Sequence, residues 1–151
     1  MERTKFNIDK DKQKRTCDGI VFDSQLEMRY YRDVLCPGVE SGTIIYYELQ
    51  KKYELQPKFS RNGKTVLPIT YIADFYIEYK DGHCEVIDTK GCPDSLAKLK
   101  RKLFWYHYPA IDYRWITYVK KWGGWLDYET VQALRKEAKM NKNKKEDLNN
   151  G

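Results

Sequence analysis

The stretch from Tyr71 to Gly91, YIADFYIEYKDGHCEVIDTKG, constrains the fold of this chain more than any other. Two runs rich in β-branched and aromatic residues are separated by a glycine-containing turn, which predicts a β-hairpin. The first strand carries Asp74, and the second carries Asp88 and Lys90. Two acids and a lysine on neighbouring strands are the groups that a metal-dependent phosphodiesterase needs, because carboxylates bind divalent cations and metal-bound water can attack phosphorus.

The turn decides whether the two acids share a face, because side chains alternate between the faces of a strand. A three-residue loop at residues 80–82 pairs Tyr79 with His83 across the turn. It then places Asp74 directly opposite Asp88, with a glycine at the left-handed position that such loops favour. A two-residue loop shifts the register by one and sends the acids to opposite faces. The catalytic interpretation therefore requires the three-residue loop or a bulge.

Acids directly opposite each other repel, which lowers stability unless a cation lies between them. Mg²⁺, or alternatively Mn²⁺, removes that repulsion, since hard cations take carboxylate oxygens and keep several waters. Lys90 lies two residues beyond Asp88 on the same face, where it can position the attacking water, help to deprotonate it or stabilise the developing negative charge. The alternative is that Asp74 and Asp88 are solvent-facing acids on a half-exposed sheet.

The composition narrows the class of protein. The 151 residues suffice for one domain with a hydrophobic core. A net charge of +6 suits a polyanion such as nucleic acid, although it would also keep an ordinary protein in solution. Four scattered cysteines without a C-x-x-C pair favour free thiols in a reduced, cytoplasmic setting over a zinc site. No apolar run approaches the roughly 20 residues that span a bilayer, so no membrane contact is expected.

Around the hairpin, the local patterns predict a single domain over residues 19–138, preceded by a basic mobile arm at 1–18 and followed by a lysine-rich disordered tail at 139–151. The motif Ser24-Gln25-Leu26-Glu27 is a capping box at a helix start. The expected elements are helices over 24–35, 95–107 and 127–138 and strands over 43–49, 52–59, 71–79, 84–90 and 112–119. This order predicts a mixed α/β core with helices against a central sheet.

The helix after the hairpin is the best candidate for contact with a nucleic acid backbone. Its leucines and Tyr106 are expected to form an apolar face toward the sheet. Basic residues beside a metal centre would bind the flanking phosphates, and the candidates are Lys98, Lys100, Arg101 and Lys102. The alternative is the ordinary solvated face of an amphipathic helix.

Asp74, the Asp88-Thr89-Lys90 triplet and the order of elements together resemble the PD-(D/E)XK nuclease superfamily, although Ala73 stands where its name has proline. A closer resemblance is to small phage-encoded endonucleases described as Holliday-junction-resolvase-like. It covers about residues 16–119 and is carried by FDSQLEMRYY, ELQPKF, ITYIADF, VIDTKG and LKRKLFWYHYP.

The resemblance implies a restriction-endonuclease-like core of helix-strand-strand-strand-helix-strand order. It also implies a Mg²⁺ site formed by Glu27, Asp74, Asp88 and the Thr89 carbonyl, with Lys90 activating the water. The capping box explains Glu27 equally well, because Glu27 is its fourth residue.

We therefore expect a metal-dependent DNA endonuclease acting at branched DNA in phage recombination or replication, in the cytoplasm of a bacterial host. Symmetric junction cleavage requires two active sites, so a homodimer is expected, with the segment 44–47 as the candidate interface. No segment resembles a base-reading module, so specificity would come from DNA shape. Two alternatives remain open. One is a nuclease on flapped, nicked or linear duplex DNA without junction selectivity, and the other is a non-catalytic nucleic-acid-binding domain of the same fold.

Overall fold

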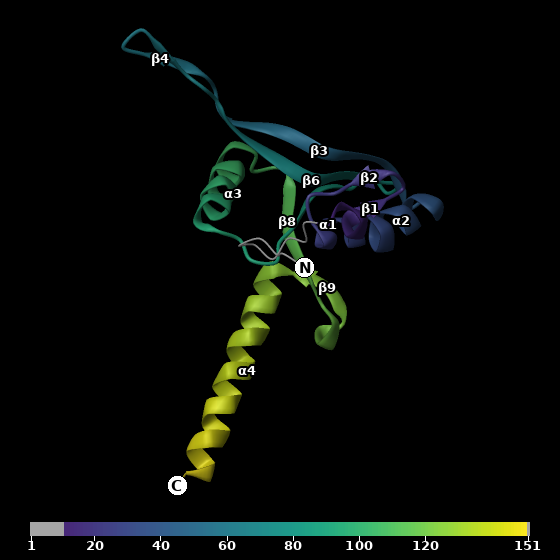
Figure 1. Cartoon of the computed structure of the whole chain (residues 1–151), viewed down its shortest axis with the longest axis vertical. Helices are drawn as coiled ribbons and strands as arrows, with labels where there is room; N and C mark the ends of the chain where they lie inside the picture. The colour runs from purple at the N-terminus through teal and green to yellow at the C-terminus, as the bar shows by residue number, and fades with distance from the viewer. Residues whose placement is uncertain (1–10, 151) are drawn as a thin grey trace.

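A mixed five-stranded sheet forms the centre of the molecule in the structure, a computed structural model that describes residues 11–150 (Figure 1). Its strands lie in the order β3-β6-β7-β8-β9, and only β7 and β8 run parallel. The strands are β3 (Ile44–Gln56), β6 (Ile69–Tyr79), β7 (Cys84–Thr89), β8 (Asp112–Val119) and β9 (Gly124–Asp127). The expected mixed α and β architecture, with helices flanking a central sheet, is confirmed.

Helices cover both faces of this sheet. One layer is the continuous helical segment made of α1 (Gln25–Tyr30), the π-helical turn η2 (Tyr31–Leu35) and α2 (Cys36–Glu40). The other is α3 (Ser95–His107), which connects β7 to β8. Val86 and Ile87 are neighbours in β7 and belong to different core clusters. Because adjacent side chains of a strand point to opposite faces, each helical layer has its own core.

The hairpin between β6 and β7 has the three-residue loop on which the sequence argument depended. The Tyr79 N–H donates to the His83 carbonyl at 2.8 Å, and the Gly82 N–H donates to the Tyr79 carbonyl at 3.0 Å. Gly82 takes a φ of +90°, the left-handed conformation that glycine adopts without strain. The resulting register sets Asp74 opposite Asp88, so the prediction of the loop and of the register is confirmed.

The first helical segment runs further than the sequence predicted. The pattern placed its end before Cys36, because proline and glycine follow, but the chain stays helical to Glu40. After the π-helical turn a new α-helical segment begins, and Pro37 lies in its first turn. The first N–H groups of a helix have no partner within the helix, so a proline is tolerated there. Gly38 packs directly on Ile44, and a Cβ there would lie 2.5 Å from the Ile44 Cδ1 atom.

The segments 43–49 and 52–59, predicted as two strands, form the single long strand β3, and Gln50 takes a φ of +56° in its middle. Beyond β3, two short strands, β4 (Phe59–Arg61) and β5 (Lys64–Val66), pair as a hairpin that projects from the sheet (Figure 1). This projection carries no core residue and was not anticipated as a separate element.

The basic arm predicted at residues 1–18 is partly corrected. Residues 1–10 lie outside the described residues. The following residues form a 3₁₀ turn (Lys12–Arg15) and the strand β1 (Thr16–Cys17), which pairs with β2 (Ile20–Val21). The Phe22 N–H donates to the Arg15 carbonyl at 2.9 Å, so this part of the arm is folded against the strand that follows it.

The final helix α4 (Tyr128–Asn149) corrects the expectation of a disordered tail for residues 139–149. Four lysines together with Met140, Glu146 and Leu148 have a high intrinsic helix propensity, and they outnumber the three asparagines of this stretch. The helix leaves the body of the protein in Figure 1, and its residues from 135 onward are exposed. Among the described residues, none of the helices combines the length and the hydropathy needed to cross a membrane.

Candidate functional site

Asp74 and Asp88 lock the strands β6 and β7 together at the point where the regular ladder ends. The Asp74 N–H donates to Asp88 Oδ1 at 3.0 Å. In return, Asp74 Oδ2 accepts from both the N–H and the hydroxyl of Thr89, each at 2.9 Å. Thr89, expected as a ligand through its carbonyl, thus contacts Asp74 through two donors. Both carboxylates are held in place by the backbone of the opposite strand.

The Asp88 side chain is 1% exposed, and its second oxygen has acceptor capacity that the fold does not use. Oδ2 lies 2.8 Å from the Lys90 Nζ atom, which makes an ion pair. Among the described residues, however, Oδ2 accepts no hydrogen bond of good geometry. A buried carboxylate oxygen is normally satisfied, so this one stands out as a donor atom for a cation.

Glu27, on α1, has the capping role that the sequence predicted, and its carboxylate lies near Asp88. Its N–H donates to the Ser24 hydroxyl at 3.1 Å, which is the capping bond, and its Oε2 accepts from the Asp23 N–H at 3.3 Å. Its other oxygen accepts from Gln50 Nε2 at 2.7 Å. The side chain is 2% exposed, so Glu27 caps the helix while its carboxylate is buried near Asp88.

The electrostatics show how closely these acids are associated. Burial raises the pKa of Glu27 to about 7, with the charges of Asp23 and Asp88 adding to the effect and hydrogen bonds from Gln50 and the Asp23 N–H opposing it. Burial also raises the pKa of Asp74 well above its usual value, and the charges of Asp88 and Glu27 raise it further. Acids that oppose one another's ionisation in a desolvated place are typical of functional sites.

Lys90 is the cation of this group. Burial by itself lowers the pKa of its ammonium, but the neighbouring charges of Asp88 and Asp74 outweigh that effect and raise it overall. Lys90 is therefore protonated at neutral pH. Its ammonium pairs with Asp88, whereas burial and the neighbouring acids oppose the ionisation of Glu27 and Asp74. We refer to Glu27, Asp74, Asp88 and Lys90 below as the acid cluster.

A second group of ionisable residues lies at the other end of β7. Ligand atoms of His83, Glu85 and Asp112 lie within 4.8 Å of one another, closer than the three carboxylates of the acid cluster, which form no such group. His83 Nε2 lies 3.1 Å from Asp112 Oδ2. Arg114 Nη1 lies 3.1 Å from Glu85 Oε2, and its Nε lies 2.9 Å from Asp127 Oδ1.

We call these five residues, His83, Glu85, Asp112, Arg114 and Asp127, the ion-pair cluster. Glu85 is buried and also accepts from the Tyr79 hydroxyl. Arg114 already satisfies the two carboxylates that flank it, and its fixed positive charge opposes the binding of a second cation. The arrangement is therefore explained by ion pairing between neighbouring strands.

Helix α3 presents a different face to the sheet from the one predicted. Leu96 and Leu99, expected in the core, are 56% and 54% exposed. The buried side is centred on Phe104, whose ring packs against those of Tyr53, Tyr71, Tyr108 and Tyr113. A cluster of aromatic rings buries more apolar area than the leucine stripe would, and it fixes the rotation of the helix.

This rotation separates the four basic residues expected to contact DNA. The Arg101 guanidinium lies 3.8 Å from the centre of the Trp115 ring and pairs with Glu129 of α4, so it holds α3 to the sheet and to α4. Its contact with DNA remains a prediction, and these two contacts give Arg101 a structural role beside it. Lys98 and Lys102 are exposed, and Lys100 is half-buried.

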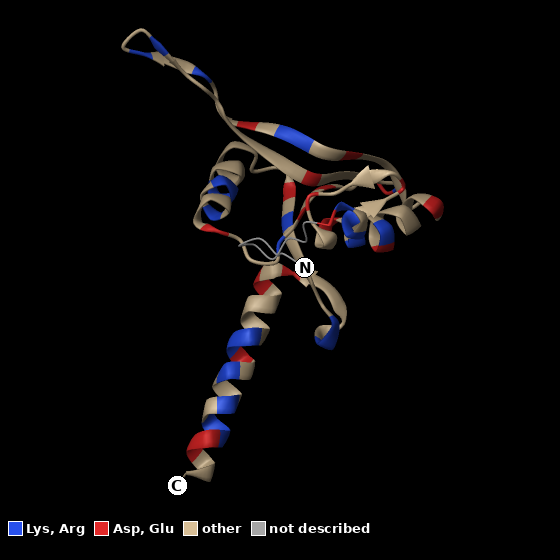
Figure 2. Cartoon of the chain, in the orientation of Figure 1, with Lys and Arg blue, Asp and Glu red and all other residues tan. Residues whose placement is uncertain are grey.

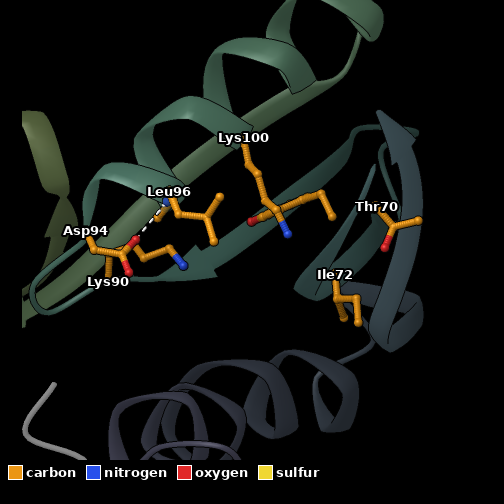
Figure 3. A pocket seen from close by; sticks show the side chains of 8 residues that line it. Thr70, Ile72, Lys90, Asp94, Leu96 and Lys100 are labelled. Atoms are coloured by element: carbon orange, nitrogen blue, oxygen red, sulfur yellow. Dashed lines mark hydrogen bonds between the residues drawn. The ribbon is translucent and has the colours of Figure 1, made fainter. Parts of the chain in front are cut away.

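Lys100 lines an open pocket of about 310 Å³ between α3 and β6, and Lys90 lines the same pocket (Figure 3). Ile72 and Leu96 provide apolar walls, so the leucine exposed by the rotation of α3 borders this space. The pocket connects the acid cluster, through Lys90, to the surface between the helix and the sheet.

Two contributors to the acid cluster escaped sequence reasoning. Gln50 holds Glu27 from a left-handed backbone position in β3, and the only signal for it was the break between the two predicted strands. The other is Tyr71, whose pKa is raised by burial and then by the charge of Asp88. Its hydroxyl accepts from the Tyr113 hydroxyl at 2.7 Å, which leaves the Tyr71 proton free to face Asp88. Tyrosines are so common in this chain that no pattern singled it out.

A family model described as "Protein of unknown function (DUF1064)" matches residues 3–124. The matched region contains the whole acid cluster, the pocket and the β4–β5 hairpin, whereas α4 lies outside it. No curated protein and no solved structure matches the chain.

Proposed function

The chain belongs to the DUF1064 family of proteins of unknown function, and from the site itself we propose that it is a metal-dependent endonuclease that hydrolyses DNA phosphodiester bonds. The observation that carries this proposal is the opposition of Asp74 and Asp88 across the hairpin, with Lys90 2.8 Å from Asp88. The order of elements, with α3 between the parallel strands β7 and β8, supports the resemblance to a restriction-endonuclease-like core.

The residues fit Mg²⁺ or Mn²⁺. All three acids offer oxygen donors, which hard divalent cations prefer, and Asp88 Oδ2 has unused acceptor capacity among the described residues. Glu27, Asp74 and Asp88 would hold the ion, and its charge would relieve the repulsion that raises the pKa values of Glu27 and Asp74. When bound, such an ion polarises the phosphate and lowers the pKa of a coordinated water.

Lys90 contributes a fixed positive charge. Because its ammonium is protonated at neutral pH, it donates hydrogen bonds to the attacking water or to a phosphate oxygen and stabilises the negative charge that develops there. Gln50 and the Thr89 donors orient the carboxylates, and Tyr71 supports Asp88 from the buried side. These groups sit on strands and a capped helix, which hold a site more precisely than loops do.

The substrate proposed is branched DNA, with a homodimer supplying two sites for paired cuts. In the segment expected at the dimer interface, Ile45 and Tyr46 are exposed, while Ile44 belongs to the core. Fewer residues of this segment are therefore available for contact with a second copy of the chain than the sequence suggested.

The test compares cleavage of a four-way junction, a nicked duplex and a linear duplex in Mg²⁺, in Mn²⁺ and in EDTA. Asp88→Asn should lower the metal-dependent rate by about two orders of magnitude or more, because it removes both a ligand and the partner of Lys90. The matched control is Asp112→Asn in the ion-pair cluster, which should retain activity within about threefold.

Each outcome separates the candidates. Equal activity of Asp88→Asn and wild type would remove the assigned site. Cleavage of linear duplex as readily as of the junction would leave a nuclease without junction selectivity. Tight DNA binding by a wild-type protein that cuts none of the substrates would identify a non-catalytic binding domain.

A further inference from the structure

The hairpin of β4 and β5, together with the residues that link it to β3 and β6, forms a projecting arm over residues 57–68 (Figure 1). Its turn, Asn62-Gly63, has φ values of +52° and +74°, the left-handed pair that a tight two-residue hairpin turn requires. The arm is thus a defined two-stranded ribbon, although it buries none of its own side chains in the core.

The two faces of the arm differ in chemistry. Phe59 pairs with Val66 and Arg61 pairs with Lys64, so these four side chains share one face. The other face of the paired strands carries only the small hydroxyl residues Ser60 and Thr65. Phe59 is 46% exposed, which leaves an aromatic ring beside two cations on the same surface.

The charge of this face is uncompensated. From residue 55 to residue 73 the sequence contains Lys58, Arg61 and Lys64 and no acidic residue. Figure 2 shows the arm with basic positions and without acidic ones. Arg61 and Lys64 lie directly opposite each other, and like charges in that position destabilise a strand pair. None of the described acidic residues pairs with either side chain, so the arrangement favours an anionic partner.

The arm leads back to the acid cluster. Its second strand continues into β6, where Thr70, Tyr71 and Ile72 line the pocket shared with Lys90 and Lys100 (Figure 3). A polyanion held by the arm therefore has a path along β6 to a pocket that carries Lys90, Lys100 and Asp94. A partner with one or two isolated charges would leave this path unused.

We propose that the arm inserts its Phe59, Arg61 and Lys64 face into the major groove of duplex DNA and holds the duplex that flanks the cleavage point. This inference rests on the proposed function and names a substrate-binding surface for it. The major groove of B-DNA is about 12 Å wide and admits a two-stranded β-ribbon, whereas the major groove of duplex RNA is too deep and narrow for side chains to read. Arg61 and Lys64 would bind phosphates on either side of the groove.

The experiment measures equilibrium binding of a fluorescent 30-base-pair DNA duplex by anisotropy in EDTA, over a series of salt concentrations. The test variant is Arg61→Ala with Lys64→Ala. The matched control, Lys144→Ala with Lys145→Ala, removes the same charge from α4, which projects elsewhere (Figure 1). Circular dichroism and thermal midpoints of both variants check that the fold is retained.

The arm variant should bind about tenfold more weakly at moderate salt, and the slope of log K against log salt should fall in magnitude by about 2, since two phosphate contacts are lost. The α4 control should change affinity less than about twofold and leave the slope unchanged. Equal losses in both variants would overturn the inference. So would a change confined to oligomeric state, or equally arm-dependent binding of duplex RNA.

Cleavage by the same proteins separates the two proposals. If wild type cuts DNA and the arm variant binds and cuts normally, the arm inference fails and the nuclease stands. If wild type cuts no DNA but binds it in an arm-dependent way, the nuclease fails and the arm inference stands. A wild-type protein that does not bind duplex DNA overturns the inference about the arm.

Discussion

The acid cluster and the ion-pair cluster lie at opposite ends of the strand β7, and they differ in how their acidic side chains are paired with basic ones. In the acid cluster, Glu27, Asp74 and Asp88 face a single cation, Lys90. In the ion-pair cluster, three carboxylates alternate with Arg114 and His83, and the hydrogen bond from Arg114 to Asp127 is the largest of the effects that raise the arginine pKa.

The comparison shows that the proximity of ligand atoms and the pairing of their charges are separate properties of a cluster. The ion-pair cluster is the tighter group, yet each of its carboxylates lies against Arg114 or His83. The acid cluster is more open, but Glu27 and Asp88 are buried, and the charges of its acids oppose one another's ionisation. Acids whose ionisation is opposed in a desolvated place are candidate ligands for a cation, because a cation would stabilise their charged forms.

The largest expected difference between the clusters is in catalysis. Lys90→Met should lower the rate of metal-dependent DNA cleavage by about 100- to 1,000-fold, because it removes the positive charge beside the reacting phosphate. Arg114→Met, which removes the cation of the ion-pair cluster, should leave that rate within about threefold. Single-turnover rates at saturating enzyme provide the measurement. A larger loss for Arg114→Met would reverse the assignment of the two clusters.

A second difference should appear in the pH dependence of stability without divalent metal. The folded pKa of Glu27, about 7, lies above its ordinary value of 4.5, so the unfolded chain ionises first as pH rises. The folded state therefore loses stability between about pH 4.5 and pH 7. Glu27→Gln lacks this loss. The free energy of unfolding of the variant minus that of wild type should therefore be about 2–3 kcal/mol larger at pH 8 than at pH 4.

The control for this pH effect is Glu85→Gln in the ion-pair cluster. It removes one partner of Arg114, so it should lower the free energy of unfolding at pH 8. Urea unfolding of the three proteins at several pH values measures both effects. If Glu27→Gln does not gain stability on wild type between pH 4 and pH 8, or if Glu85→Gln gains as much, the contrast between the clusters is wrong.

The smallest expected effect is stabilisation by metal. At a Mn²⁺ concentration ten times the dissociation constant, binding to the folded state should add about 1.4 kcal/mol, which raises the thermal midpoint by a few degrees. Asp88→Asn should lose this shift, and Asp112→Asn should keep it. Differential scanning fluorimetry with and without Mn²⁺ measures the change. A shift lost only in Asp112→Asn would place the metal in the ion-pair cluster.

The sequence by itself determined the parts of the site that depend on neighbouring residues. The loop at 80–82 fixed the register of Asp74 and Asp88, because a glycine supplied the left-handed position that the loop requires. The capping box placed Glu27 in the first turn of α1. Strand alternation then put Lys90 next to Asp88. All three follow from local backbone geometry.

Only the tertiary structure decided which side of each element meets the rest of the protein. The leucines predicted the face of α3 that meets the sheet, but the aromatic rings around Phe104 set a rotation that exposes Leu96 and places Arg101 against Trp115. The left-handed backbone conformation of Gln50 is tolerated because the Gln50 side chain donates a hydrogen bond to the Glu27 carboxylate on a distant helix. Such outcomes depend on packing and charge between residues far apart in the chain, where propensity and periodicity carry no information.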